Sequence, residues 1–272
     1  SMLLKPLGVA TGTVVDRLRD AARSLGFIDV WARRTGDRRW WVRAEAGRAL
    51  GLVREARALS ILFRLLDDDH EEVRAAAVEA LGLIGHPHAI PVLVPRLPDQ
   101  SRHQRARIIE ALREFGDVAT PELVAHAGIH QGDAVVVADI LGQIGGTAAV
   151  TTLKTWAQDE RPALREAALR GLGTIGLDEV GVGLARHGLD DEDVSVRAAA
   201  ARALGRAHRK EAAADLARHL SDEWTVAAHC AEALRRIGRP GVPYLQAHVN
   251  DDSYVGDLAR QMLWERSQAE VR

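Results

Sequence analysis

The residues of this sequence that could carry out chemistry are few and widely spaced. The single cysteine, Cys230, directly follows His229, and neighbouring residues on a helix point about 100° apart, which is wrong for a nucleophile and its base. His86 and His88 flank a proline and could place two imidazoles on one metal ion, but no third ligand is indicated. We interpret this pair as a solvated turn. The other histidines are scattered along the chain.

Three glycines imitate a cofactor motif. Gly171, Gly173 and Gly176 have the G-x-G-x-x-G spacing of dinucleotide-binding loops. That motif needs a strand before it and a helix after it, whereas these glycines lie within and at the end of a predicted helix. The sequence also lacks G-x-S-x-G, P-loop and C-x-x-C patterns. We therefore assign no catalytic, cofactor-binding or metal-binding residue and expect no small-molecule substrate.

Arginine and tryptophan gather near the N-terminus. Residues 1–57 carry twelve basic and six acidic side chains, whereas the whole chain has a formal net charge of −2. The basic and aromatic patch consists of Arg33, Arg34, Arg38, Arg39, Trp40 and Trp41. Such side chains suit a membrane surface, nucleic acid or a protein interface. The alternative is that the two tryptophans pack against the first helices and the arginines are solvated. The overall charge argues against a general nucleic-acid binder.

Helices must position these side chains. The chain is 47% hydrophobic but only 4% aromatic, so its core is built from Ala, Leu, Val and Ile, which is typical of closely packed helices. A segment of about thirty residues recurs eight times, and each copy reads as two helices that cannot bury both faces alone. The copies are anchored on Leu50, Leu81, Leu112, Leu141, Leu172, Leu204, Leu234 and Leu263. We predict an all-α solenoid with a helical cap over 1–38, repeats over 39–267 and a tail over 268–272.

The second repeat shows the expected local structure. Helical spacing predicts one buried face of Val73, Ala77, Ala80, Leu81 and Ile84. Asp67 to Asp69 suit the N-terminus of this helix, Gly85 its end, and Pro87 the start of a helix over about 87–97. Before the repeats, we expect a helix over about 13–25 to turn inward Val14, Leu18, Ala21, Ala22 and Leu25.

The repeated frame resembles the HEAT family, in the short bacterial form called PBS lyase HEAT-like repeats. The residues that carry the resemblance in the second repeat are Asp69, Val73, Arg74, Ala77, Leu81, Gly82 and Gly85. Pro91 and Pro243 stand where the family bends the first helix of a repeat. The resemblance covers roughly 39–266 and implies a right-handed superhelix of about eight two-helix repeats.

The same resemblance implies an Asp/Arg ladder between repeats, and it allows two enzymes with this architecture to be compared with the sequence. In the family, one repeated arginine joins an Asp/Arg ladder between repeats; the matching residues are Arg43, Arg74, Arg105, Arg165 and Arg197. Ala134, Ala227 and Gly256 replace it elsewhere, so the ladder should be interrupted there. Deoxyhypusine hydroxylase shares the architecture and binds iron through His-Glu pairs early in second helices. None of the matching pairs here is His-Glu, which argues against that activity. Bilin lyases also use these repeats, but no residue here favours tetrapyrrole chemistry.

In HEAT proteins the second helix of each repeat lines the concave face. Two places before and after the anchor leucines, this face is acidic in the middle of the chain and basic later. Its candidate partner-binding residues are Glu79, Glu110, Glu114, Asp139, Arg170, Arg202, Arg206 and Arg236. A continuous phosphate track is missing, so we interpret the face either as a bipolar groove for a protein partner or as a solvated mixed surface.

A narrower resemblance concerns location. Bacterial HEAT proteins with a short N-terminal membrane anchor resemble this chain in the double tryptophan of WWVRAEAGRALG, residues 40–51, and in residues 222–226, DEWTV. This resemblance implies a cytoplasmic repeat domain at the inner face of the membrane, with the anchor upstream of the sequence.

We predict a non-enzymatic scaffold that binds a protein partner on the concave face. Two alternatives remain open: a nucleic-acid-binding or DNA-repair protein that uses the N-terminal patch, and a non-catalytic subunit of a lyase or transferase complex.

Overall fold

The computed structural model describes residues 13–98 and 101–270, and every regular element within them is a helix. The chain divides into two compact units, residues 1–129 and 130–272. Among the helices described, none is long and apolar enough to cross a membrane.

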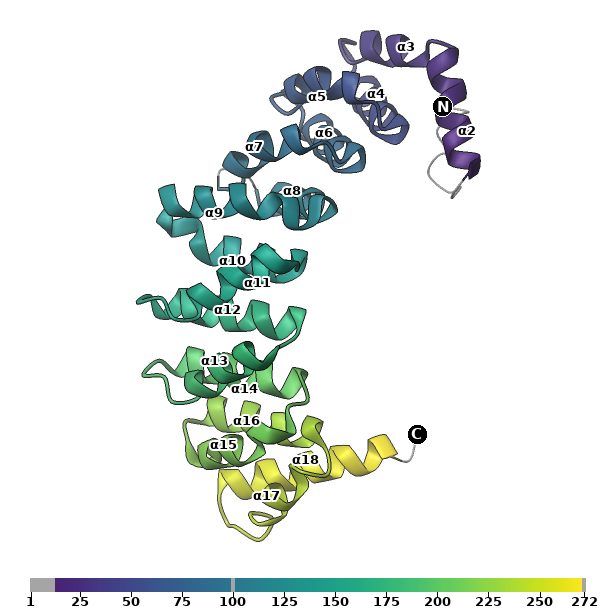
Figure 1. The fold of residues 1–272 in the computed structure, drawn as a ribbon. Coiled ribbons are helices and arrows are strands. Elements are labelled where there is room, and N and C mark those ends of the chain that lie inside the picture. The colour runs from purple at the N-terminus through teal and green to yellow at the C-terminus, as the bar shows by residue number, and fades with distance from the viewer. Residues whose placement is uncertain (1–12, 99–100, 271–272) are drawn as a thin grey trace. The chain divides into compact units, whose positions relative to one another are not determined.

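The first unit is a stack of helix pairs. In Figure 1 the second helices α4, α6 and α8 follow one another on one side, and the first helices α5, α7 and α9 follow on the other. The α-helices are α2 (Thr13–Ser24), α3 (Phe27–Arg34), α4 (Trp40–Val53), α5 (Leu59–Leu65), α6 (Glu71–Ile84), α7 (Ile90–Leu93), α8 (Arg102–Phe115) and α9 (Thr120–Ile129). The 3-10 helices are η1 (Ala56–Ala58), η2 (Pro87–Ala89), η3 (Val94–Arg96) and η4 (Gly116–Ala119).

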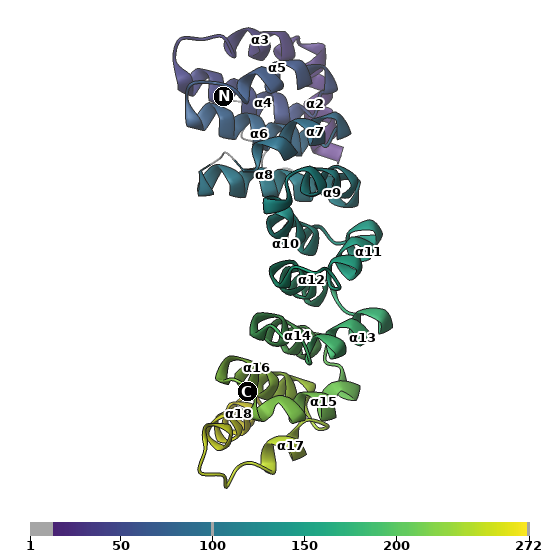
Figure 2. The ribbon, with the colours of Figure 1, turned by 90° about the vertical axis from the view of Figure 1, so that its left-hand side faces the viewer.

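The second unit repeats this arrangement. Figure 2 shows α10, α12, α14 and α16 in one row and α11, α13 and α15 in the other. The α-helices are α10 (Ala134–Ile144), α11 (Thr147–Trp156), α12 (Pro162–Ile175), α13 (Glu179–Gly188), α14 (Val194–Arg206), α15 (Ala213–Arg218), α16 (Trp224–Ile237), α17 (Val242–Gln246) and α18 (Tyr254–Glu270). The 3-10 helices are η5 (Gln131–Asp133), η6 (Lys210–Ala212) and η7 (His219–Ser221). Stacked pairs of this kind confirm the predicted all-α solenoid.

The anchor leucines hold the repeats together with small residues beside them. The anchors from Leu50 to Leu234 are buried, and Leu263 on α18 is half-buried. Five anchors are followed by glycine, and each of these glycines faces the residue before the next anchor: Ala80, Ala111, Gly171, Ala203 or Ala233. A Cβ on Gly205 would lie 2.8 Å from the Cα of Ala233, so only glycine permits this approach of α14 and α16. The small residues at these repeat positions therefore allow consecutive second helices to pack in close contact.

The second repeat differs in detail from its prediction. Val73, Ala77, Ala80 and Leu81 are buried as predicted, and Gly85 ends α6 with a φ of 68°. The N-cap of α6 is His70, whose Nδ1 accepts a hydrogen bond from the backbone N–H of Glu72. The prediction that the aspartates before it cap this helix was wrong, because Asp68 accepts from His70 N–H and binds an arginine instead. The helix expected over 87–97 is divided into η2, α7 and η3, since its prolines lack an N–H.

The N-terminal helices pack in two ways. α2 ends close to the predicted bound, and Ala22 is buried, but Leu25 lies just beyond its end and is 69% exposed, contrary to expectation. The side chains of Val14 and Leu18 lie outside the described residues. α3 packs against α4 as α13 packs against α14. It therefore has the place of a first helix in a repeat.

Candidate functional site

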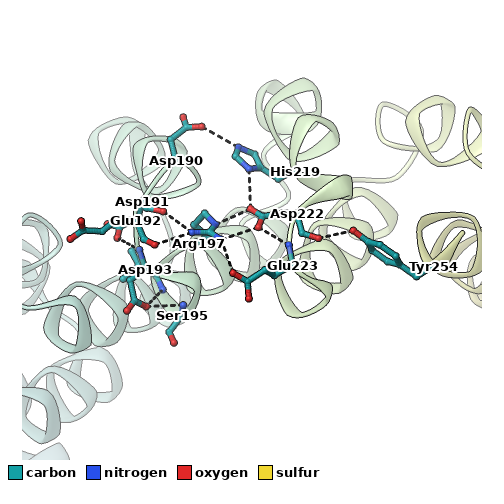
Figure 3. Close-up of polar contacts among 11 residues, drawn as sticks. Asp190, Asp191, Glu192, Asp193, Ser195, Arg197, His219, Asp222, Glu223 and Tyr254 are labelled. Atoms are coloured by element: carbon teal, nitrogen blue, oxygen red, sulfur yellow. Dashed lines mark hydrogen bonds and ion pairs between the residues drawn. The ribbon is translucent and has the colours of Figure 1, made fainter.

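An arginine joins consecutive repeats at the start of several second helices. Arg197 on α14 holds both carboxylate oxygens of Asp222, at 2.8 and 2.9 Å, as Figure 3 shows. Its Nη1 also donates to the backbone carbonyls of Asp191 and Glu192, just before its own helix. The Tyr254 hydroxyl donates to the carbonyl of Asp222 from the next repeat, at 2.7 Å. One side chain thus ties the loop before α14 to the loop before α16.

The same geometry occurs at two other repeats. Arg165 binds both oxygens of Asp191 at 2.8 Å, and Arg43 binds those of Asp68 at 2.8 and 2.6 Å. Burial alone would raise the pKa of Asp68, Asp191 and Asp222, yet the hydrogen bonds from their arginines and nearby backbone N–H groups hold each pKa below its ordinary value. The carboxylates are therefore ionised partners at neutral pH.

The remaining ladder positions are different. Arg74 donates to the carbonyls of Asp68 and Asp69, and Arg105 to those of Leu97 and Pro98. The aspartate in register with Arg74 is residue 99, outside the described residues, and the residue in register with Arg105 is a glycine, residue 128.

Local partners occupy the aspartates where the ladder arginine is absent. Ala134 replaces the ladder arginine whose partner would be Asp159, and Asp159 instead binds Arg161 at 2.8 Å. Ala227 replaces the ladder arginine whose partner would be Asp251, and Asp251 instead binds His248 at 2.7 Å. These carboxylates are satisfied within their own loops and do not connect two repeats.

The N-terminal patch is partly committed to structure. Trp40 stacks on the His70 ring of the next repeat with centroids 3.9 Å apart, and it contacts Trp41 edge-on. Trp40 is 37% and Trp41 54% exposed. Arg39 binds Asp37, and this hydrogen bonding lowers the pKa of Asp37 to about 2. The two tryptophans therefore have different surroundings, one packed on a neighbour and one turned to solvent.

The arginines of this patch also divide. Arg34, at the end of α3, lies 3.4 Å from Glu45. Arg33, Arg38 and Arg39 are exposed. Part of the patch therefore packs against neighbouring helices, and three of its guanidinium groups are exposed.

A pocket between α14 and α16 brings together three of the predicted basic residues. We call this cavity of about 190 Å³ the basic pocket. α14 contributes Arg202, Gly205 and Arg206, and α16 contributes His229, Glu232, Ala233 and Arg236. Arg236 binds Glu232 at 2.6 Å, and Glu232 also receives two hydrogen bonds of 2.7 Å from Arg235. The lining therefore carries three guanidinium groups against one carboxylate.

A pocket between α6 and α8 brings together the predicted acidic residues of the first unit. We call this cavity of about 330 Å³ the acidic pocket. α6 contributes Glu79, Gly82 and Leu83, and α8 contributes Arg107, Glu110, Ala111 and Glu114. Glu79 lies 3.7 Å from Arg48, and Glu110 binds Arg113 at 2.8 Å, both outside the lining. Relative to the anchor leucines, these are the same seven positions that line the basic pocket.

The other two predicted face residues neutralise each other. Arg170 on α12 donates to Asp139 on α10 at 2.6 Å and also contacts Glu166. Glu166 in turn lies 3.8 Å from Arg202. Glu166, His229 and Arg107 were not predicted as residues of this face, although they lie three or four places before the predicted row, share its helical face and could have been found by that spacing.

The cysteine, glycine and histidine residues that resemble parts of catalytic or cofactor motifs lie in packed or hydrogen-bonded positions. Burial raises the pKa of the Cys230 thiol to about 12, so it is protonated at neutral pH. A Cβ on Gly173 would lie 2.8 Å from the Cα of Ala203, which identifies that glycine as a packing position. His86 Nδ1 accepts a hydrogen bond from the N–H of His88, within a turn. Across residues 13–98 and 101–270, no cluster of His, Cys, Asp and Glu suits a metal ion.

Comparisons with known proteins agree with this construction. A family model for HEAT repeats matches residues 28–113 and 184–264, more than half of the chain. A search of the curated proteins finds no match. Among solved structures, a mutant of Kap121p is similar over 96% of this chain and 36% of its own, with a TM-score of 0.63 and 14% identity. At this identity the similarity bears on the fold alone.

Two further structures are similar with lower scores. The complex of CpcE and CpcF of phycocyanin lyase from Nostoc sp. PCC7120 has a TM-score of 0.40 and 20% identity, over 89% of this chain and 94% of that one. Human deoxyhypusine hydroxylase in complex with glycerol has a TM-score of 0.39 and 23% identity, over 98% and 95%.

Proposed function

The chain belongs to the HEAT-repeat family, and from this premise we propose that it is a non-enzymatic scaffold that binds a protein partner along its second helices. The observation that carries the proposal is the construction of the two pockets. The same seven repeat positions line both, and only their side chains make one acidic and the other basic. A fixed backbone with variable exposed charges is what selective recognition of a protein surface requires.

The charge pattern favours protein over nucleic acid. Phosphate recognition needs arginines that follow the backbone of the ligand without opposing charge. Here Asp139 and Glu166 occupy Arg170, and Glu232 lies within the basic pocket. Alternating charges of this kind match the mixed rim of a protein interface.

The proposed scaffold does not itself catalyse a reaction. Its one thiol is buried and protonated, which removes its best nucleophile. The location at the cytoplasmic face of a membrane stays a prediction; Arg33, Arg38 and Arg39 are the exposed side chains that would face anionic lipids.

Affinity capture tests the scaffold function. The immobilised chain is compared with E79K/E110K/D139K, which reverses three acidic residues of the face. The matched control E71K/E160K/E179K carries the same charge change on glutamates outside it. We expect wild type and control to retain the same partner and the face variant to lose it at least fivefold, measured by quantitative mass spectrometry. Equal recovery on all three proteins would contradict the proposal.

A further inference from the structure

We propose that the basic pocket binds a carboxylate side chain, Asp or Glu, presented by an acidic segment of the protein partner. This inference rests on the proposed scaffold function and names the chemistry of one contact. It follows from the charges of the pocket, its size and its apolar floor.

Arg206 supplies a positive charge without a counter-ion. It is exposed, and its Nη1 donates to the neutral hydroxyl of Thr174 at 3.1 Å. Among the described residues, no ion pair joins a carboxylate to Arg206. A guanidinium presents five donors in a planar fork that matches a carboxylate with two parallel hydrogen bonds. Arg206 can therefore receive a carboxylate without first breaking an ion pair.

Arg202 and Arg236 lie beside Arg206 in the lining, and each is partly paired with a carboxylate. Arg202 lies 3.8 Å from Glu166, at the outer limit of an ion pair. Arg236 donates its Nε–H to Glu232. Both carboxylate oxygens of Glu232 also accept hydrogen bonds from Arg235, one from its Nε and one from its Nη2. Glu232 is thus neutralised mainly by Arg235, which lies outside the lining, and the pocket keeps a surplus of positive charge.

The pocket has room for a side chain and little more. Its floor is the close contact of Gly205 with Ala233, an apolar surface suited to methylene groups. Its volume of about 190 Å³ is below the range of about 300–1,000 Å³ typical of small-molecule sites. A glutamate side chain matches both features, with its methylenes on the floor and its carboxylate among the arginines.

Glu232 reduces the positive charge of the basic pocket without removing it. Its carboxylate forms part of the lining and is held mainly by Arg235, so the three arginines still attract an anion. This attraction and the repulsion by Glu232 both grow with the charge of the ligand, so charge alone does not separate a carboxylate from a phosphate. The carboxylate side chain is favoured by the small volume and the apolar floor of the pocket, which suit a short chain of methylenes that ends in a charged group.

His229 reports on occupancy. It faces Arg202 and Arg206 from α14 and Glu232 and Arg236 on its own helix. Burial, and then the charge of Arg202, lower the pKa of His229 below its ordinary value. A carboxylate bound among the arginines would oppose the effect of Arg202, so occupancy should raise this pKa.

The test titrates a fluorescein-labelled octaglutamate peptide with the full chain at about 150 mM salt and follows fluorescence anisotropy. We expect saturable binding that R206E/R236E weakens at least tenfold. The control K210E/R239E reverses two exposed basic residues of the same unit outside the pocket and should change the affinity less than twofold. Octaglutamine should not bind. Circular dichroism shows whether each variant is folded, and R206Q/R236Q, which removes charge without reversing it, should weaken binding at least threefold.

Several outcomes would overturn the proposal. They are an absence of saturation with octaglutamate, equal losses in R206E/R236E and K210E/R239E, or an unchanged His229 pKa in NMR titrations of wild type with saturating peptide. Tighter binding of an octathymidylate, lost in the same pocket variant, would identify a phosphate site instead. Failure of affinity capture together with pocket-dependent octaglutamate binding would reject the scaffold function and leave the carboxylate site standing.

Discussion

In the unit formed by residues 1–129, a pocket between α6 and α8 is walled by Glu79 and Glu114; in the other unit, the matching positions between α14 and α16 are Arg202 and Arg236. The residues between them also correspond, since Glu110 in the first pocket has the place of Glu232 in the second. The helices, the spacing and the glycine floor are the same. The two wall positions have changed sign, Leu83 is replaced by Arg206, and the glutamate between them is kept.

The two pockets share the residues that build the repeats and differ in the exposed residues around them. The buried anchor, the glycine after it and the small residue before the next anchor recur, so consecutive second helices meet at a fixed distance. The positions two places from the anchor point away from that contact and tolerate glutamate, arginine or leucine. Two faces can thus carry opposite charges without any change of fold.

The largest expected effect comes from breaking the shared floor. In Gly205→Val, a branched side chain would have to fit where a Cβ alone lies 2.8 Å from the Cα of Ala233. We expect a loss of about 3 kcal/mol in the free energy of unfolding, because α14 and α16 must move apart or strain. Urea denaturation followed by circular dichroism measures it. The octaglutamate affinity should also fall, since the floor of the basic pocket is displaced.

The control places a methyl group where there is space. Gly183 lies in α13, and a Cβ on it would meet nothing within 4 Å. Gly183→Ala should raise stability by about 0.5–1 kcal/mol, the gain expected from replacing a helical glycine. A loss of similar size in Gly183→Ala and Gly205→Val would mean that glycine content matters, and not the close contact of the second helices.

The fold could be predicted because the same constraint acts eight times. Each repeat must bury its leucine and keep small residues beside it, so the pattern averages out local exceptions. Single positions were less predictable. Leu25 has an apolar side chain in helical register with Ala22, but α2 ends at Ser24, so the register does not continue to it.

The helical face on which the candidate site residues lie could be predicted from the sequence, but their ion-pair partners could not. The row two places from each anchor includes the arginines of the basic pocket, because their helical register is fixed. The partners of those arginines depend on rotamers and on helices thirty residues away. Asp139 and Arg170 were expected as parts of a charged surface, yet they hold each other at 2.6 Å. Sequence spacing cannot distinguish a free charge from a paired one.

The carboxylate of Asp191, which joins two repeats, should contribute more to the free energy of unfolding than that of Asp159, which binds within its own loop. The side chains of Arg165 and Asp191 are each 13% exposed and join two repeats. Asp191→Asn should cost about 2 kcal/mol at pH 7, since a charged hydrogen-bonded pair is broken. Asp159→Asn, whose carboxylate serves only the arginine two residues later, should cost less than about 1 kcal/mol.

The pH dependence of this difference has a definite sign. Folding lowers the pKa of Asp191 below its ordinary 3.8, so the ionised carboxylate stabilises the folded state above that value. Its contribution is lost as the pH falls through the lower, folded-state pKa. The gap in unfolding free energy between wild type and Asp191→Asn should therefore stay constant above about pH 5 and shrink below the ordinary pKa. A gap that grows on acidification would contradict the ladder's role.

The smallest effect, and the most direct test of the comparison, is to exchange the charges of the pockets. The variant E79R/L83R/E114R gives the acidic pocket the three arginines of the basic one and leaves Glu110 where Glu232 stands. In an R206E/R236E background, it should restore octaglutamate affinity by about tenfold, or about 1.4 kcal/mol. The control E71K/E122K adds charge to the same unit outside the pocket and should restore less than twofold. If both variants restore binding equally, net charge explains the affinity, and the shared construction of the two pockets does not.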